Sequence, residues 1–328
     1  MLSELRNLPA PAKLNLFLHV TGRRADGYHL LETVFQFIDL ADSIDLRLRD
    51  DGEIRRLDPP GDIPPEVDLT LKAAKALQTA TGCPLGADIA LRKLVPIGAG
   101  LGGGSSDAAT VLLGLNRLWR LGLSRSDLIG IARPLGADVP VFVFGRNAYA
   151  TGIGDRFRPI LLPRRWFVLV MPPVSVATEG VFKDPKLTRD TKPITMLGFS
   201  KLAPALGGRN DLQTVVLARQ PLVKAALAGL EAAVKGAGSG VGMGSTSGST
   251  SGSTSGSTSA STSASTSGSR PRYGSSPRMT GSGACVFAAA EGLELAQDIA
   301  RRVLSHNVGT VHVVAGLAGH PLGSRQVG

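Results

Sequence analysis

Two kinds of hydrophobic pattern alternate along the chain. Short segments that alternate between polar and apolar residues, or that are apolar throughout, predict β-strands. Longer segments with apolar residues at three- and four-residue steps predict amphipathic helices. The predicted strands are 13–20, 43–49, 87–93, 166–171, 285–290 and 310–315, and the predicted helices are 69–79, 106–121, one that begins at Ser124, 222–234 and 293–304. Strands and helices mix in both halves of the chain, which predicts an α+β architecture.

A boundary between two domains is expected near residue 160. The apolar run Trp166–Met171 is followed by two prolines and has the pattern of the first strand of a new sheet. We therefore predict an N-terminal domain of residues 1–160 and a C-terminal domain of residues 161–328. The 328 residues are enough for two domains of ordinary size.

A low-complexity tract interrupts the second half. Residues 244–269 contain only Gly, Ser, Thr and Ala in a four-residue repeat. Such a tract has almost no apolar surface to bury and cannot offset the entropy lost on ordering. We predict a disordered, linker-like insertion at about 238–276 in the C-terminal domain.

Terminal residues define two of the predicted helices. Ser105 or Ser106 is expected to cap the helix 106–121, and Gly122 is expected to end it. Ser124, with Asp127 three residues later, has the spacing of a capping box at the start of the next helix.

Composition narrows the class of partner. The net charge of +10 suits anionic partners, either nucleic acid or phosphorylated metabolites. The aromatic content of 5% and the lack of any run of five basic residues argue against a stacking platform for nucleic acid. Only two cysteines occur, Cys83 and Cys285, which predicts a reducing compartment. No apolar stretch reaches about 18 residues without a charge, and the N-terminus lacks a signal pattern, so a cytoplasmic protein without a membrane span is expected.

The main chemical feature is a glycine-rich loop, Pro96–Ser106. Five glycines lie between Gly98 and Gly104, between a predicted strand and a predicted helix. Glycines allow backbone N–H groups to approach a ligand, and the start of the helix adds a positive electrostatic end. The loop is therefore expected to bind an anion such as a triphosphate.

Two common phosphate motifs do not describe this loop. The Walker pattern requires a lysine after the glycines, and none is present. Gly98, Gly100 and Gly103 match GxGxxG, but no N-terminal βαβ start and no suitably spaced carboxylate accompany them.

Three segments together resemble the GHMP kinases, a superfamily that includes galactokinase and the homoserine, mevalonate and phosphomevalonate kinases. They are Pro11–Asn15, Pro96–Ala109 and Met279–Cys285. Within the superfamily, four segments, one of them inside the glycine loop, resemble the kinases of a cytidine diphosphate-linked methylerythritol in non-mevalonate isoprenoid synthesis. They are Arg24–His29, Gly102–Asp107, Leu135–Pro140 and Phe182–Pro185.

The resemblance implies a fold and an activity. The expected fold has an N-terminal domain like ribosomal S5 domain 2 and a ferredoxin-like C-terminal domain, with the active site between them. The expected enzyme is an ATP-dependent small-molecule kinase that uses Mg²⁺ bound through ATP, with Ser105 or Ser106 as the candidate protein ligand. No nucleic-acid or membrane partner is implied.

The resemblance also implies site residues. Lys13 and Asp138 correspond to the catalytic pair. The expected ATP site comprises Lys93, Pro96, Gly98, Gly100, Leu101, Gly102, Gly103, Gly104, Ser105 and Ser106. The expected substrate site comprises Asn15, Tyr28, His29, Thr178 and Phe182, and Gly281, Ser282 and Gly283 are expected to form a turn beside the phosphates. Cys285 is expected to be buried and not catalytic.

One departure and two alternatives are noted. The related kinases usually have Asn-Leu where this chain has Asp68-Leu69, and Asp lacks the amide donor for an adenine contact. The first alternative is a GHMP kinase for another acceptor, which would have no need of a base sandwich from Tyr28, His29 and Phe182. The second is a basic RNA-binding protein with an S5-like domain, for which RNA affinity would fall steeply with salt.

Overall fold

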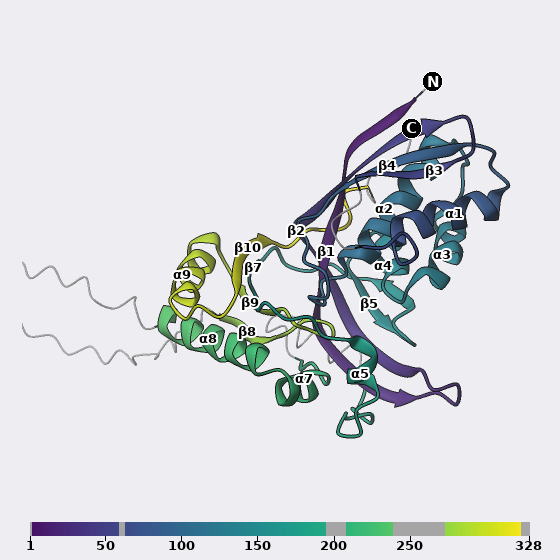
Figure 1. The fold of residues 1–328 in the computed structure, drawn as a ribbon. Helices are drawn as coiled ribbons and strands as arrows, with labels where there is room; N and C mark the ends of the chain where they lie inside the picture. The colour runs from purple at the N-terminus through teal and green to yellow at the C-terminus, as the bar shows by residue number, and fades with distance from the viewer. Residues whose placement is uncertain (1, 59–62, 195–207, 239–272, 323–328) are drawn as a thin grey trace, which may run out of the picture.

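The computed structural model describes residues 2–58, 63–194, 208–238 and 273–322, and these residues form two sheets with helices packed against each (Figure 1). The first sheet has six strands in the order β3-β4-β2-β5-β6, with β1 paired to β2. Its strands are β1 (Glu4–Arg23), β2 (His29–Arg49), β3 (Ile54–Asp58), β4 (Gly86–Arg92), β5 (Ala148–Thr151) and β6 (Arg156–Pro159). The helices of this half are α1 (Leu69–Thr81), α2 (Gly103–Leu118), α3 (Arg125–Ala132) and α4 (Val139–Phe144), with a 3₁₀ turn at Arg133–Leu135.

The second sheet has four strands in the order β10-β7-β9-β8. They are β7 (Trp166–Met171), β8 (Tyr273–Met279), β9 (Val286–Ala290) and β10 (Thr310–Ala315). The helices of this half are α5 (Thr178–Phe182), α7 (Gln213–Arg219), α8 (Pro221–Gly238) and α9 (Leu293–Leu304), of which α8 and α9 pack on the sheet. The observed mixture of helices and strands agrees with the predicted α+β class.

Most of the predicted insertion, residues 239–272, lies outside the described residues. The flanking elements are α8, which ends at Gly238, and β8, which begins at Tyr273. The predicted insertion at about 238–276 therefore overlaps β8 at its C-terminal end.

A long antiparallel hairpin of β1 and β2 runs along both halves of the molecule (Figure 1). The predicted strands 13–20 and 43–49 are only parts of these strands, because the intervening sequence continues the pairing. The register shifts between Pro11 and Lys13 and again between Asn15 and Leu18. Such bulges release backbone groups from the ladder and redirect side chains. Here they release the N–H groups of Lys13 and Asn15 for bonds to other loops.

Helix α2 corrects one prediction about capping. The helix begins at Gly103, and its N-cap is Gly102 in the left-handed conformation, without a side-chain cap. The predicted caps Ser105 and Ser106 thus lie inside the first turn, and the helix ends at Leu118, before the predicted Leu121. The capping box of Ser124 and Asp127 on α3 is confirmed.

The two sheets share part of one apolar core. Phe17 of β1 packs in the same cluster as Phe167 of β7 and Phe287 of β9, and all three side chains are almost completely buried. Because apolar burial is the main stabilising term of a fold, this cluster holds the hairpin against the second sheet. The predicted burial of Cys285 is confirmed, and burial raises the pKa of its thiol.

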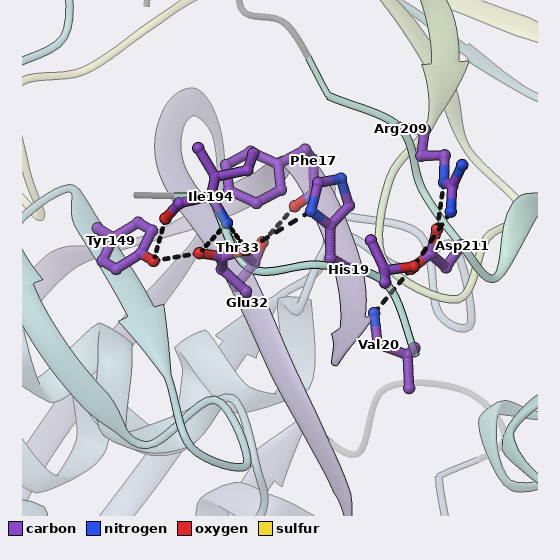
Figure 2. A network of polar contacts seen from close by, with 10 residues as sticks. Phe17, His19, Val20, Glu32, Thr33, Tyr149, Ile194, Arg209 and Asp211 are labelled. Atoms are coloured by element: carbon purple, nitrogen blue, oxygen red, sulfur yellow. Dashed lines mark hydrogen bonds and ion pairs between the residues drawn. The ribbon is translucent and has the colours of Figure 1, made fainter. Parts of the chain in front are cut away.

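The buried carboxylate of Glu32 connects the hairpin to neighbouring segments (Figure 2). Glu32 of β2 accepts hydrogen bonds from the Tyr149 hydroxyl and from the Ile194 N–H, and its Oε2 lies 3.5 Å from Nδ1 of His19. Burial opposes the ionisation of Glu32, but the bonds from His19, Tyr149 and Ile194 hold its pKa below the ordinary value.

None of the helices in the described ranges combines the length and apolar character needed to cross a bilayer.

Candidate active site

Three segments that are distant in sequence meet at a cavity of about 1050 Å³. They are the bulged part of β1, the glycine loop before α2, and the turn between β8 and β9. The predicted site residues that line the cavity are Lys13, Asn15, Lys93, Pro96, Gly98, Gly100, Leu101, Gly102, Gly103, Gly104, Ser105, Asp138, Thr178, Phe182, Gly281, Ser282 and Gly283. Tyr28, His29 and Ser106 are not among the lining residues.

Backbone hydrogen bonds join the three segments directly. The N–H of Lys13 donates to Leu101 O at 2.9 Å, and the N–H of Cys285 donates to Ala99 O at 3.1 Å. The N–H of Asn15 donates to the Thr280 hydroxyl at 2.8 Å. The glycine loop is therefore held on both sides, which keeps its shape before any ligand binds.

The glycine loop has the conformation and the clearance that the sequence predicts. Gly98, Gly100 and Gly102 all have φ between 72° and 74°, where residues with a side chain are strained. A Cβ on Gly100 would lie 2.6 Å from Thr280 O and 2.8 Å from Gly283 O. The loop leads into the 16 residues of α2, whose positive N-terminal end favours an anion. The arrangement fits the phosphates of a nucleotide.

Lys13 has all its donors occupied although its side chain is only 3% exposed. Its ammonium donates to Asn15 Oδ1 at 2.7 Å and to Gly100 O at 3.0 Å, and it lies 3.2 Å from Asp138 Oδ2. A buried ammonium requires such partners. Lys13 is thus fixed between the glycine loop and a carboxylate that belongs to another loop.

Asp138 occupies the N-cap position of the short helix α4, but its side chain makes no capping bond. Its side chain is 35% exposed and lines the cavity. A carboxylate that is paired with Lys13 and still reaches the cavity can accept the proton of a bound hydroxyl.

Lys93 belongs to a buried charge cluster that the sequence analysis missed. Its ammonium contacts Asp42 Oδ2 at 2.5 Å and Asp107 Oδ2 at 2.8 Å. Burial raises the pKa of Asp107 to about 7, Lys93 opposes this rise, and Asp42 adds to it. The sequence places Asp107 only in the segment Gly102–Asp107, because the approach of Asp42 depends on β2 lying beside β4.

The two serines that were expected near a metal differ. Ser105 lines the cavity, whereas the Ser106 hydroxyl is completely buried and has no hydrogen-bond partner within the described ranges. No cluster of three His, Cys, Asp or Glu side chains suited to a metal ion occurs in the described part of the chain. A divalent ion here would thus depend on phosphate oxygens for most of its ligands, and the Ser105 hydroxyl is available to it.

The residues expected to hold the substrate base are only partly brought together. The rings of His29 and Phe182 lie 5.1 Å apart with planes tilted by 31°, so these two pack as expected. Tyr28, directly before β2, is 62% exposed and makes no such ring contact with any residue in the described ranges. Thr178 and Ser282 contact each other through their hydroxyls at 2.7 Å, which links α5 to the turn after β8.

Asp68 has another role than an adenine contact in this structure. One oxygen accepts bonds from the Thr70 N–H and hydroxyl, and the other pairs with Arg56 at 2.9 Å. The residue caps helix α1 and is buried. Asp68 lines the cavity, but its oxygens are already bonded to the protein.

Two further residues, Asn210 and Thr280, hold the site; Thr280 lies in the segment Met279–Cys285, but neither was predicted as a site residue. Asn210 donates to Met279 O at 2.9 Å and to Gly281 O at 2.7 Å, so it holds the turn beside Lys13. Thr280 receives the Asn15 N–H described above. The short polar run Arg209–Asp211 could have indicated a loop contact, but not its partner.

Comparisons with known proteins agree with this geometry. The model of the GHMP kinases N terminal domain matches residues 68–146. The chain is 46% identical over 321 residues to 4-diphosphocytidyl-2-C-methyl-D-erythritol kinase of Cupriavidus necator, which covers 97% of this chain and 95% of that protein. It is 51% identical over 284 residues to the protein of the same name from Azoarcus sp., which covers 87% of this chain and 85% of that protein.

Solved structures are also similar. A crystal structure of 4-(cytidine 5'-diphospho)-2C-methyl-D-erythritol kinase is 30% identical with a TM-score of 0.69 and covers 95% of this chain and 98% of that one. A homoserine kinase from Cytophaga hutchinsonii has a TM-score of 0.66 at 16% identity and covers 98% of this chain and 96% of that one, which supports the fold alone.

Proposed function

The chain belongs to the 4-diphosphocytidyl-2-C-methyl-D-erythritol kinases, with the α+β two-domain GHMP kinase fold, and we infer that it transfers a phosphoryl group from ATP to the 2-hydroxyl of that substrate. The products are ADP and the 2-phosphate, in the non-mevalonate route to isoprenoid precursors. The observation that carries this inference is the meeting of Lys13, Asp138 and the glycine loop at one cavity.

ATP is proposed to bind with its phosphates at the glycine loop. The left-handed glycines and the start of α2 supply backbone N–H groups and a favourable field for the phosphates. The turn Gly281–Gly283 approaches the same loop, since a Cβ on Gly281 would lie 2.8 Å from Gly100 O. Lys93, which is paired with two carboxylates, lies next to Gly103 and lines the cavity on that side of the loop.

The proposed transfer of the phosphoryl group uses the pair of Lys13 and Asp138 at the cavity. The substrate hydroxyl oxygen forms a bond to the γ-phosphorus, the bond from phosphorus to the bridging oxygen breaks, and ADP leaves with that electron pair. The hydroxyl proton passes to the Asp138 carboxylate. Lys13 holds this carboxylate in place and places a positive charge near the transferring group, which is the usual contribution of a protein to phosphoryl transfer.

We propose that Mg²⁺ binds to the site through the phosphates of ATP. When bound, the ion would neutralise phosphate charge, with the Ser105 hydroxyl, which lines the cavity, as the candidate protein ligand. We also propose that the reaction takes place in the cytoplasm, which is compatible with Cys83 and Cys285 being free thiols.

The cytidine group is proposed to bind beside the turn that joins β1 to β2, next to His29. His29 and Phe182 already pack together there, and the exposed Tyr28 is free to cover a flat ring from the other side. Asn15 and Thr178, which both line the cavity, are proposed to contact the methylerythritol part.

The test is ADP release from ATP and Mg²⁺, with and without the cytidine substrate, for the wild type and for Asp138→Ala. We expect release that requires the substrate and that is lost in the variant. Turnover only with another alcohol, such as mevalonate or homoserine, would keep the superfamily assignment and reject the substrate. Calorimetric ATP binding without turnover of any alcohol would reject the proposed reaction.

A further inference from the structure

The guanidinium of Arg189 is held by the backbone of the segment that carries Phe182. Its two terminal nitrogens donate to three carbonyl oxygens, those of Leu187 at 3.0 Å, Phe182 at 2.9 Å and Asp184 at 2.8 Å. A planar guanidinium bonded at both ends has little freedom to rotate. The N–H on Nε therefore has a fixed direction.

The Nε donor points at His29. Nε of Arg189 donates to Nε2 of His29 at 3.0 Å, while the imidazole ring packs on Phe182. Arg189 thus connects the two rings that are proposed to hold the pyrimidine. Among the described residues, no group is hydrogen-bonded to the other ring nitrogen, Nδ1.

The bond determines where the imidazole carries its proton. Arginine has only donors, so Nε2 must act as the acceptor with its lone pair. A neutral imidazole with a lone pair on Nε2 carries its proton on Nδ1. The ring also stays neutral, because burial and the nearby cations Arg189 and Arg23 lower the pKa of His29. His29 therefore offers the pyrimidine one N–H donor and no acceptor from its ring nitrogens.

We propose that Arg189 is a specificity-determining positioning residue, which makes the site select cytosine over uracil by holding His29 in the Nδ1–H tautomer. Cytosine has an acceptor at N3, whereas uracil has an N–H donor at the same position. A fixed donor on His29 bonds the first and repels the second. This inference rests on the proposed function, because it assumes that His29 reads the pyrimidine of the cytidine substrate.

The test compares kcat/KM for the cytidine substrate and for its uridine counterpart. In Arg189→Gln, the amide can accept a bond from Nε2–H, so the other tautomer becomes available. We expect the preference of the wild type for cytidine to fall by roughly tenfold or more in Arg189→Gln, mostly through KM. Arg189→Lys keeps a cationic donor and is expected to retain most of the preference.

Arg219 provides the matched control. It donates to Gly180 O at 3.1 Å and pairs with Asp184, so it holds the same segment without contacting His29. Arg219→Gln is expected to change the turnover of both substrates by the same factor. An equal loss of preference in Arg219→Gln and Arg189→Gln would mean that Arg189 has a general structural role, and would overturn the proposal.

The tautomer itself can be measured in the wild type by ¹⁵N NMR of the imidazole. A proton on Nδ1 supports the proposal, and a proton on Nε2 overturns it even if no variant folds. If the wild type strongly prefers cytidine and Arg189→Gln keeps that preference, only the role of Arg189 fails. If the wild type phosphorylates neither pyrimidine substrate, the proposed function fails together with this inference.

Discussion

The ammonium of Lys13 lies 3.2 Å from the carboxylate of Asp138, yet only 3% of the lysine side chain is exposed, against 35% of the aspartate. The pair is therefore asymmetric. The Lys13 ammonium is held by three protein acceptors, whereas part of the Asp138 side chain is exposed to a ligand. Lys13 can therefore position other groups, and Asp138 can touch the reacting hydroxyl.

Asp138→Asn should remove the proton acceptor and leave the phosphate loop intact. We expect kcat to fall by about 100-fold or more, because a positioned general base contributes about that much. The ATP dissociation constant, measured by calorimetry, should change by less than about twofold. Asp127→Ala is the control, since it breaks the exposed capping box of α3, which does not line the cavity, and should lower stability without lowering kcat. A kcat of Asp138→Asn close to that of the wild type would contradict the assigned role.

The Thr33 hydroxyl is predicted to orient Asn15 and, through it, Lys13. Thr33 Oγ1 donates to Phe17 O (Figure 2) and accepts from Asn15 Nδ2 at 2.9 Å, which turns Asn15 Oδ1 toward the ammonium. Thr33→Val should lower kcat by roughly tenfold and stability by about 1–3 kcal/mol, because two buried polar groups lose their partner. Thr33→Ser keeps the hydroxyl and should restore most of kcat.

Thr110→Val is the matched control for Thr33→Val. Thr110 is also completely buried, but its hydroxyl has only longer contacts, at 3.3 and 3.4 Å, and does not reach Asn15. Its kcat should stay within about twofold of the wild type, measured beside thermal unfolding. An equal fall of kcat in both variants would show that buried threonines act here only through stability.

Gly100→Ala should disrupt the contact between the glycine loop and the turn after β8. The new Cβ would meet two backbone oxygens of that turn, and φ of +74° is strained for alanine. We expect a loss of stability of about 1–3 kcal/mol and weaker ATP binding, measured by thermal unfolding and calorimetry. Gly130→Ala on α3 has nothing within 4 Å of its Cβ and should stabilise slightly. Unchanged ATP affinity in Gly100→Ala would reject the assignment of this loop.

His320 is predicted to make stability depend on pH. Burial, and to a smaller extent Arg125, lowers the pKa of His320 to about 3. Because the folded state disfavours the proton, this contribution is present above about pH 6.5 and is lost as the pH falls toward 3. His320→Asn cannot titrate, so its deficit relative to the wild type should narrow between pH 6.5 and 4.5 by roughly 2 kcal/mol. Denaturant unfolding at both pH values measures this, with the exposed His306→Asn as the control, and a constant deficit would contradict the prediction.

Features that depend on neighbours in the sequence were predicted well. The capping box at Ser124 needs only two residues at the correct spacing, and the glycine loop needs only glycines before a helix. The start of α2 was predicted at the wrong residue, because a left-handed Gly102 satisfies the geometry of the N-cap before either serine is reached. The full length of the β1–β2 hairpin was also missed, since pairing across the two strands extends them beyond the segments with a clear pattern.

Features that depend on distant residues required the tertiary structure. Nothing near Lys93 in the sequence indicates that Asp42 will contact it, and nothing near His29 indicates Arg189. The resemblance to known kinases predicted Lys13, Asp138 and the turn at Gly281, but did not say what orients them.

The sequence alone determined the class of fold and the glycine loop before a helix, and the resemblance to known kinases predicted a catalytic role for Lys13 and Asp138, because local spacing and recurrent motifs carry that information. The tertiary structure alone decided how the pair is held, which carboxylates neutralise Lys93, and which nitrogen of His29 accepts the bond from Arg189. The physical reason is that hydrogen bonds and ion pairs act over about 3 Å, so their partners are known only when the chain has brought distant segments together.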